Sequence, residues 1–109
     1  MAGQLILPEA LRSIDSATFT GVYQTIGIPL AHPCSLVKLV NNSTVLVTIS
    51  WDGINDHDIL PPNSFVLYDI QSNHAQFNGL YIRQGIQFYV KGAAGVGLVY
   101  LTVLYIIEG

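Results

Sequence analysis

Residues 36–67, with the sequence LVKLVNNSTVLVTISWDGINDHDILPPNSFVL, decide the fold class. They predict a first strand, a tight turn at Asn41-Asn42 and a second strand. Asparagine tolerates the left-handed backbone that a two-residue hairpin turn needs. In the second strand, apolar side chains at the odd-numbered positions from 45 to 51 alternate with a mixed set, which is the period of a strand with one buried face.

The rest of the chain repeats this alternation of strands and polar turns. A polar loop, WDGINDHD, ends the second strand, and a further strand over residues 64–70 places Phe65 and Leu67 on one face. Residues 19–30 and 80–90 also have the composition of strands, and residues 71–79 and 92–97 have that of turns and connections. These strand candidates, without a convincing long helix, predict an all-β fold: a single antiparallel β-sandwich or jelly-roll-like domain.

The last strand, residues 98–107 with the sequence LVYLTVLYII, is apolar on both faces. Such a strand needs burial on both sides. We therefore expect it to be central in its sheet, or to turn its outer face toward another subunit.

Residues 1–16 differ from the β-domain expected over residues 17–109. Residues 4–7 form a short apolar segment that Pro8 ends, and residues 9–14 predict about one helical turn after the proline. An extended apolar segment has no core of its own. We expect an extended N-terminal arm that packs either on its own domain or on a neighbouring subunit.

The composition is unusual for a small domain. Of the 109 residues, 50% are hydrophobic and only 10% are charged, whereas soluble domains average about 25% charged residues. This balance favours a homo-oligomer whose surface is partly covered by other subunits.

The net charge of −3 and the four scattered cations argue against nucleic-acid binding. The longest apolar run is too short for a membrane helix, and we expect no membrane partner.

The loop over residues 52–58 is the densest polar cluster. It predicts a structural turn, because Asp and Asn bond their own backbone. Its carboxylates and amide also make it a weak candidate for a calcium site, although its spacing does not match the helix–loop–helix calcium pattern. The metal candidates are Asp52, Asn55, Asp56 and Asp58.

Catalytic and cofactor-binding residues are not expected. The three histidines fall in predicted loops, no serine stands in a nucleophile-elbow pattern, and Cys34 has no evident activating partner. A single cysteine also excludes an internal disulfide. The tyrosines and Trp51 suit core and interface packing, or a sugar-binding face.

The runs VLVTISWDG, DHDILP and FYVKGAAGVGLVYLT resemble small structural proteins of tailed bacteriophages. The matching pieces are V-x-I-S-x-D-G at residues 47–53, D-H-D-x-L-P at residues 56–61, and F-Y-V-K-G…G-x-V-Y-L-T at residues 88–102. The resemblance covers roughly residues 17–107. It implies a virion part that works by assembly, as a capsid decoration protein or in a neck, collar or tail ring.

We therefore expect a non-enzymatic structural subunit without cofactors, made in the host cytoplasm, whose partners are its own copies and other virion proteins such as capsid, portal or tail components. The alternative is a carbohydrate- or calcium-binding sandwich used in host attachment. The expected interface residues lie in the arm and on the outer side of the last strand: Gln4, Leu5, Ile6, Leu7, Leu98, Tyr100, Leu104 and Ile106.

Overall fold

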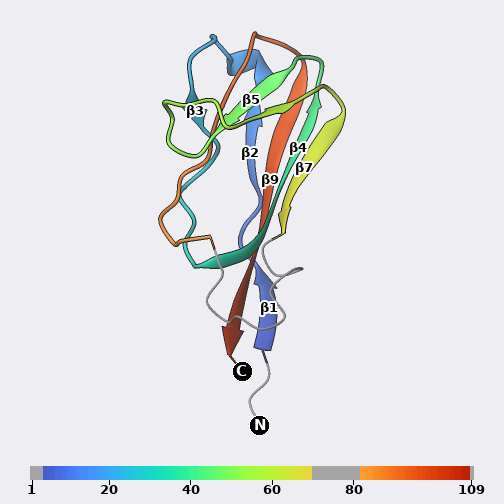
Figure 1. The fold of residues 1–109 in the computed structure, drawn as a ribbon. Helices are drawn as coiled ribbons and strands as arrows, with labels where there is room; N and C mark the ends of the chain where they lie inside the picture. The colour runs from blue at the N-terminus through green and yellow to red at the C-terminus, as the bar shows by residue number, and fades with distance from the viewer. Residues whose placement is uncertain (1–3, 70–81, 109) are drawn as a thin grey trace.

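The computed structural model describes residues 4–69 and 82–108. Over these residues the chain forms two antiparallel sheets packed against one core, which confirms the predicted all-β sandwich (Figure 1). Sheet A contains β1 (Gln4–Pro8), β2 (Arg12–Asp15), β4 (Cys34–Ser43), β7 (Ser64–Asp69) and β9 (Gly97–Glu108). Sheet B contains β3 (Gln24–Thr25), β5 (Val47–Ser50), β6 (Asp58–Leu60) and β8 (Tyr89–Lys91), and the short 3-10 helix η1 (Ser16–Thr18) follows β2. The expected polar turn at residues 71–79 lies outside the described residues.

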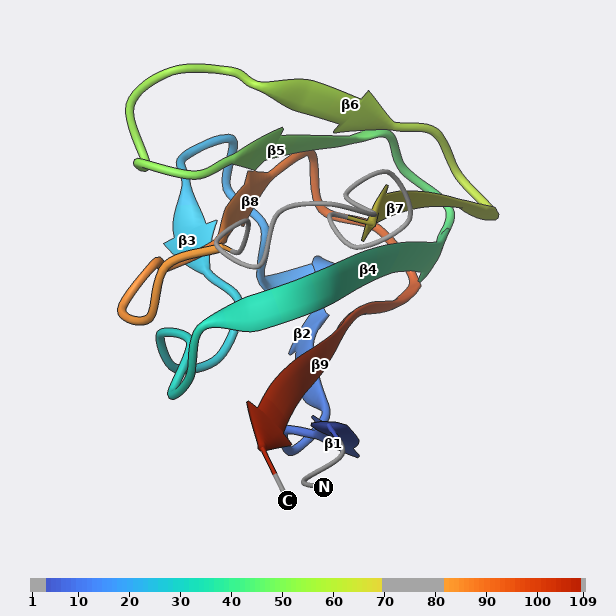
Figure 2. The ribbon, with the colours of Figure 1, turned by 60° about the horizontal axis from the view of Figure 1, so that its bottom comes forward.

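Strand β9 lies inside sheet A, which is the first of the two positions expected from its two apolar faces. It pairs along one edge with β4 and along the other edge with β1 and β2, so the order is β1-β9-β4-β7 with β2 also on β9. Its side chains Val99, Leu101 and Val103 point into the core, where each is at most 1% exposed. Sheet B has the order β3-β8-β5-β6 and covers the same core from the other side (Figure 2).

The core between the sheets is mostly aliphatic and includes a group of aromatic rings in mutual contact. The rings of Trp51 and Phe88 meet edge to face, and Trp51 also meets Tyr68 edge to face, an arrangement that aromatic side chains favour. The buried core residues are Phe19, Ile26, Leu30, Cys34, Val37, Leu39, Val47, Ile49, Leu60, Ile82, Phe88, Val90, Val99, Leu101 and Val103.

The N-terminal segment packs on its own chain. Gln4–Pro8 pairs with the end of β9, from Gln4 opposite Glu108 to Pro8 opposite Leu104, and the two strands extend together from the body of the sandwich (Figure 1). The helical turn predicted over residues 9–14 is wrong, because residues 12–15 form β2 and pair with residues 98–101 of β9. Pairing with an available strand edge overrides the weak local preference for a helical turn.

The hairpin predicted at Asn41-Asn42 is also wrong. Strand β4 continues through both residues to Ser43, and β5 then crosses to the other sheet. Asn41 is fully buried, and its Nδ2 donates to the carbonyl oxygens of Val45 and Leu60 at 2.8 and 2.9 Å. Its side chain therefore stabilises the connection by which the chain passes from sheet A to sheet B, and it does not form a hairpin turn.

Two other expected strands are much shorter than predicted. Within residues 19–30 only Gln24–Thr25 forms a strand, because Gly21 and Gly27 adopt positive φ angles and bend the chain on either side. Within the described part of residues 80–90, Ile82 makes an isolated bridge to Cys34 and a turn intervenes before β8 begins at Tyr89.

Candidate functional site

An apolar outer face runs across three strands of sheet A. Antiparallel residues that lie directly opposite one another share a face, and the register aligns Phe65 with Val40 and Val40 with Tyr100. Two residues further along, Lys38 stands opposite Leu67 and Thr102 on the same face, and four residues along Leu36 stands opposite Leu104. We call this set the outer patch: Leu36, Val40, Phe65, Leu67, Tyr100 and Leu104.

The outer patch is open to solvent at the β7 side. Phe65 is 64% exposed and Leu67 is 44% exposed, while the other four side chains are half-buried. The alternation that the sequence predicts for this strand, with Phe65 and Leu67 on one face, is confirmed. Grouped exposed apolar side chains of this kind are typical of interaction surfaces.

The structure brings only some of the expected interface residues into this patch. Tyr100 and Leu104 belong to it, while Leu98 lies at its margin, opposite Asn42. The arm residues lie in the β1–β9 ribbon, where Ile6 is opposite Ile106 and is 62% exposed. In the same ribbon Gln4, Leu5 and Leu7 are opposite Glu108, Ile107 and Tyr105. The interface residues expected from the sequence did not include the exposed Phe65 and Leu67, although their alternation within one strand is visible in the sequence.

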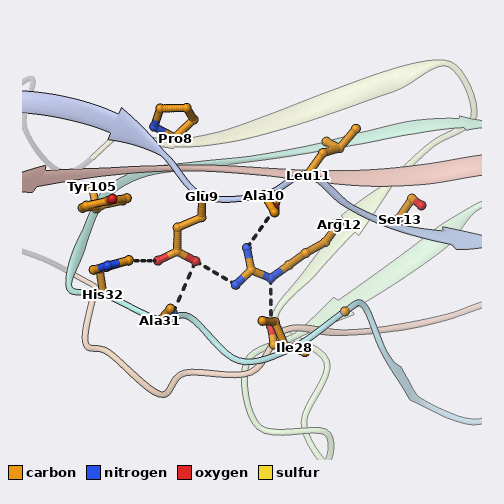
Figure 3. Close-up of a pocket in the computed structure, with 11 residues that line it drawn as sticks. Pro8, Glu9, Ala10, Leu11, Arg12, Ser13, Ile28, Ala31, His32 and Tyr105 are labelled. Carbon is orange, nitrogen blue, oxygen red and sulfur yellow. Dashed lines mark hydrogen bonds and ion pairs between the residues drawn. The ribbon is translucent and has the colours of Figure 1, made fainter.

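A second feature is a buried ionic cluster where β1 bends into β2. The Glu9 side chain is 4% exposed and the Arg12 side chain 5%. Arg12 Nη2 donates to Glu9 Oε1 at 2.7 Å, and His32 Nδ1 lies 2.7 Å from Glu9 Oε2 (Figure 3). The His32 ring stacks on Tyr105 with centroids 3.7 Å apart. The cluster thus ties the bend to the loop before β4 and to the end of β9.

Arg12 is held mainly by backbone carbonyls. Its Nε donates to Ile28 O at 2.8 Å, and its Nη2 also donates to Pro29 O at 3.0 Å. Gly27 lies against the stem of this side chain: a Cβ there would come within 2.6 Å of an Arg12 carbon, and its φ of +70° favours glycine. This close fit holds the Arg12 guanidinium in place, so its role is to stabilise the fold.

The Glu9 carboxylate is ionised, and both of its oxygens accept hydrogen bonds. Burial raises its pKa, but hydrogen bonds from Arg12, His32 and the Ala31 amide outweigh that effect and hold the pKa below its usual value. A pocket of about 600 Å³ lies beside it, with Pro8, Leu11, Ile28 and Tyr105 among its walls. Because the carboxylate already accepts three hydrogen bonds, it is poorly placed to take a proton from a ligand.

Cys34 lies beside this cluster but is not activated. Its thiol is fully buried and donates to the His32 carbonyl oxygen at 2.9 Å. Burial, reinforced by the neighbouring Glu9 charge, raises the pKa of the thiol to about 12. Since the thiolate is the nucleophilic form, this cysteine is a poor nucleophile at neutral pH.

The loop over residues 52–58 is a hydrogen-bonded turn, as predicted. Asp52 accepts from the amides of Ile54 and Asn55 at 2.8 and 2.9 Å, and from the Asn55 side chain. These bonds, led by that of the Asn55 amide, hold the Asp52 pKa well below its usual range.

The other weak metal candidates point to different partners. Asp56 accepts from the Tyr23 hydroxyl and pairs with Lys91 at 3.1 Å, and Asp58 accepts from the Tyr68 hydroxyl at 3.0 Å. Within residues 4–69 and 82–108, no three side chains of His, Cys, Asp or Glu come together in a way that could hold a metal ion.

A shallow hollow of about 380 Å³ lies beside this loop. Trp51, His57, Asp58 and Tyr68 line it. The Trp51 amide donates to His57 Nδ1 at 2.9 Å, which leaves Nε2 as the ring's donor when the imidazole is neutral. Burial raises the Tyr68 pKa to about 12, so its hydroxyl stays protonated at neutral pH. The hollow thus offers aromatic surface, a carboxylate acceptor and an imidazole donor.

Comparison with known proteins identified no similar protein. The chain matches no protein-family model, no curated protein and no solved structure. The described residues contain no helix that is long and apolar enough to span a membrane.

Proposed function

We propose that this chain is a non-enzymatic structural subunit of a tailed-bacteriophage particle, in a capsid decoration layer or in a neck, collar or tail ring. Its partners are copies of itself and other virion proteins, and assembly takes place through its β-surfaces. The virion assignment rests on the resemblance of residues 17–107 to small phage structural proteins. The assembly role rests on the outer patch.

The outer patch carries the proposal because covering it with another subunit would remove apolar surface from water. Fully burying one large apolar side chain contributes about 1.5–3 kcal/mol. Phe65 and Leu67 are half exposed or nearly so, so they gain a substantial part of that amount, and the half-buried members gain less. The low charge of the chain, 10% of residues, supports the same reading, since charged residues are depleted at interface cores.

The groups of the ionic cluster are engaged in structural contacts. Cys34 is buried with a raised pKa, and Glu9 is saturated by hydrogen bonds. The ionic cluster therefore suits a structural clamp.

Sedimentation velocity over a wide concentration range tests the assembly role. We expect the wild-type chain to associate, and we expect Tyr100→Glu to weaken that association because it places a charge on the outer patch. Ile54→Glu is the matched control, since Ile54 is 82% exposed on the loop after β5 and outside the patch. A wild-type chain that remains a monomer at millimolar concentration would overturn the proposal. Labelling the protein in purified particles tests the virion assignment.

A carbohydrate-binding module for host attachment is the second candidate function. The hollow beside Trp51 favours it, because sugars bind where an aromatic surface meets a few polar groups. A glycan array tests this candidate, with Trp51→Ala expected to abolish any signal. The calcium form of this alternative has no support in the described residues, whose carboxylates bind separate partners.

A further inference from the structure

Among the described residues, strand β7 is the outermost strand at one edge of sheet A. Within the described residues it pairs with β4 alone, in an uninterrupted register from Ser64 to Asp69. Natural proteins usually guard such an edge with proline, lysine, a bulge or a very short strand. The sequence of β7, SFVLYD, contains neither proline nor lysine, and its pairing shows no bulge.

Three of the other outermost strands of the described sheets are guarded, and the fourth, β2, has only four residues and pairs with β9. β1 ends in Pro8, β3 has two residues, and β6 has three residues and is followed by Pro61. Strand β7 has six residues. The contrast marks β7 as the edge that is suited to pairing with another strand.

The alternation of β7 restricts how two copies could pair. Phe65 and Leu67 face outward, while Val66 and Tyr68 face the core. A shift of register by one residue would place outward residues opposite inward ones. A twofold axis that relates two β7 strands must therefore place one residue opposite its own copy. An axis between two successive residues would pair outward residues with inward ones.

Only a centre at Val66 pairs both outward apolar residues, Phe65 and Leu67, with apolar partners; with the axis at Phe65, Leu67 would lie opposite Asn63. With the axis at Val66, Phe65 lies opposite Leu67 of the second copy, Leu67 lies opposite its Phe65, and the two Val66 side chains meet on the core side. With the axis at Leu67, each Phe65 would instead lie opposite the Asp69 carboxylate. Aromatic–aliphatic pairs stabilise a sheet, whereas a carboxylate set against a phenyl ring does not.

We propose that two copies of this chain pair antiparallel through β7, with the twofold axis at Val66, so that the two A sheets form one continuous sheet. This inference rests on the proposed assembly role and specifies its first contact. The interface is isologous, which is the commonest symmetry of protein dimers. It also joins the two outer patches into one apolar surface that is available for further assembly.

Disulfide trapping tests the register. In a Val66→Cys variant the two new cysteines face each other, so mild oxidation should give a covalent dimer. Ser64→Cys is the matched control, because Ser64 lies on the same strand and face with similar exposure, but in this register it lies opposite Tyr68. The native Cys34 is fully buried and can stay in place. We expect Val66→Cys to cross-link at least about tenfold faster, since disulfides require Cα atoms within about 7 Å.

A mixing experiment provides a second readout at exposed positions, where substitution is well tolerated. Phe65→Cys and Leu67→Cys should each cross-link poorly alone and should form a mixed disulfide when combined. If the wild-type chain associates but neither experiment shows this selectivity, the β7 pairing is wrong and the assembly role stands. If the wild-type chain is monomeric, both proposals fail. Protection of Phe65→Cys from thiol labelling only when a different virion protein is added would assign the edge to that protein and overturn the self-pairing.

Discussion

Replacing Glu9 with alanine should destabilise the fold more than any other loss of a carboxylate in the described residues. The change leaves the 5%-exposed Arg12 side chain without its counter-charge and removes the partner of His32. Breaking a buried ion pair from one side costs about 3–5 kcal/mol. Because Arg12 keeps its bonds to the carbonyl oxygens of Ile28 and Pro29, we expect the lower end, about 3 kcal/mol.

Thermal unfolding followed by circular dichroism measures this loss. For a domain of about 100 residues, 1 kcal/mol shifts Tm by about 4–8 °C, so Glu9→Ala should lower Tm by about 15 °C. Glu9→Gln keeps the shape and removes the charge. Bonds to a charged group contribute about 1 kcal/mol more than neutral ones, and two such bonds are affected, so a loss of about 2 kcal/mol is expected.

The pH dependence gives an independent check of the same charge. The folded-state pKa of Glu9 is lowered from the ordinary value of 4.5. The stabilisation it provides is therefore fully present above pH 4.5 and is lost as the pH falls through the lower, folded-state pKa. The difference in stability between the wild type and Glu9→Gln should be constant near neutral pH and should shrink under acid conditions.

The control for these measurements is Asp56→Asn, which removes an exposed ion pair with Lys91 and should change Tm little. A Glu9→Ala variant that unfolds within about 1 kcal/mol of the wild type would refute the reasoning, because a surface pair is worth that little. It would show that water reaches the cluster and screens it.

Three further predictions concern single sites. Asn41→Ala should cost about 2–3 kcal/mol in urea unfolding, because it leaves buried carbonyl oxygens without their donor. Gly97→Ala should destabilise severely in a thermal melt, since its Cβ would collide with the Asn42 carbonyl oxygen; Gly21→Ala, also at positive φ but in open space, should cost only about 1 kcal/mol. Cys34 should react with a thiol reagent only after denaturant is added, because it is fully buried and its pKa is about 12; rapid labelling of the native chain would contradict its placement.

The sequence was sufficient for those features of the fold that depend on local alternation. The two apolar faces of residues 98–107 predicted either a central strand or an outer face against another subunit, and the structure makes the strand central; the alternation predicted that Phe65 and Leu67 share one face. Both predictions need only the period of side chains along one strand. The structure supplied what the period cannot, namely which strands lie next to one another.

Contacts between distant segments explain the errors. Asn41 has the composition of a turn, but its amide reaches the Leu60 carbonyl oxygen, 19 residues away, and no local pattern contains that partner. The same holds for Arg12, whose acceptor Ile28 is 16 residues away. One signal was available: in a chain with only 10% charged residues, Glu9 and Arg12 stand three positions apart beside a proline. A charged pair of opposite sign in so apolar a setting is a candidate for burial together.

The position of β9 has a consequence for the order of events during synthesis. The strand that holds β1, β2 and β4 together is the last element of the described chain to leave the ribosome. Until it emerges, β1 and β2 lack the strand with which they pair in the described residues, and β4 lacks a neighbour. Folding of these sheets must therefore await the synthesis of β9, and until then the apolar strands β1 and β2 that precede it are unpaired. Rapid translation or a protecting chaperone would benefit such a chain.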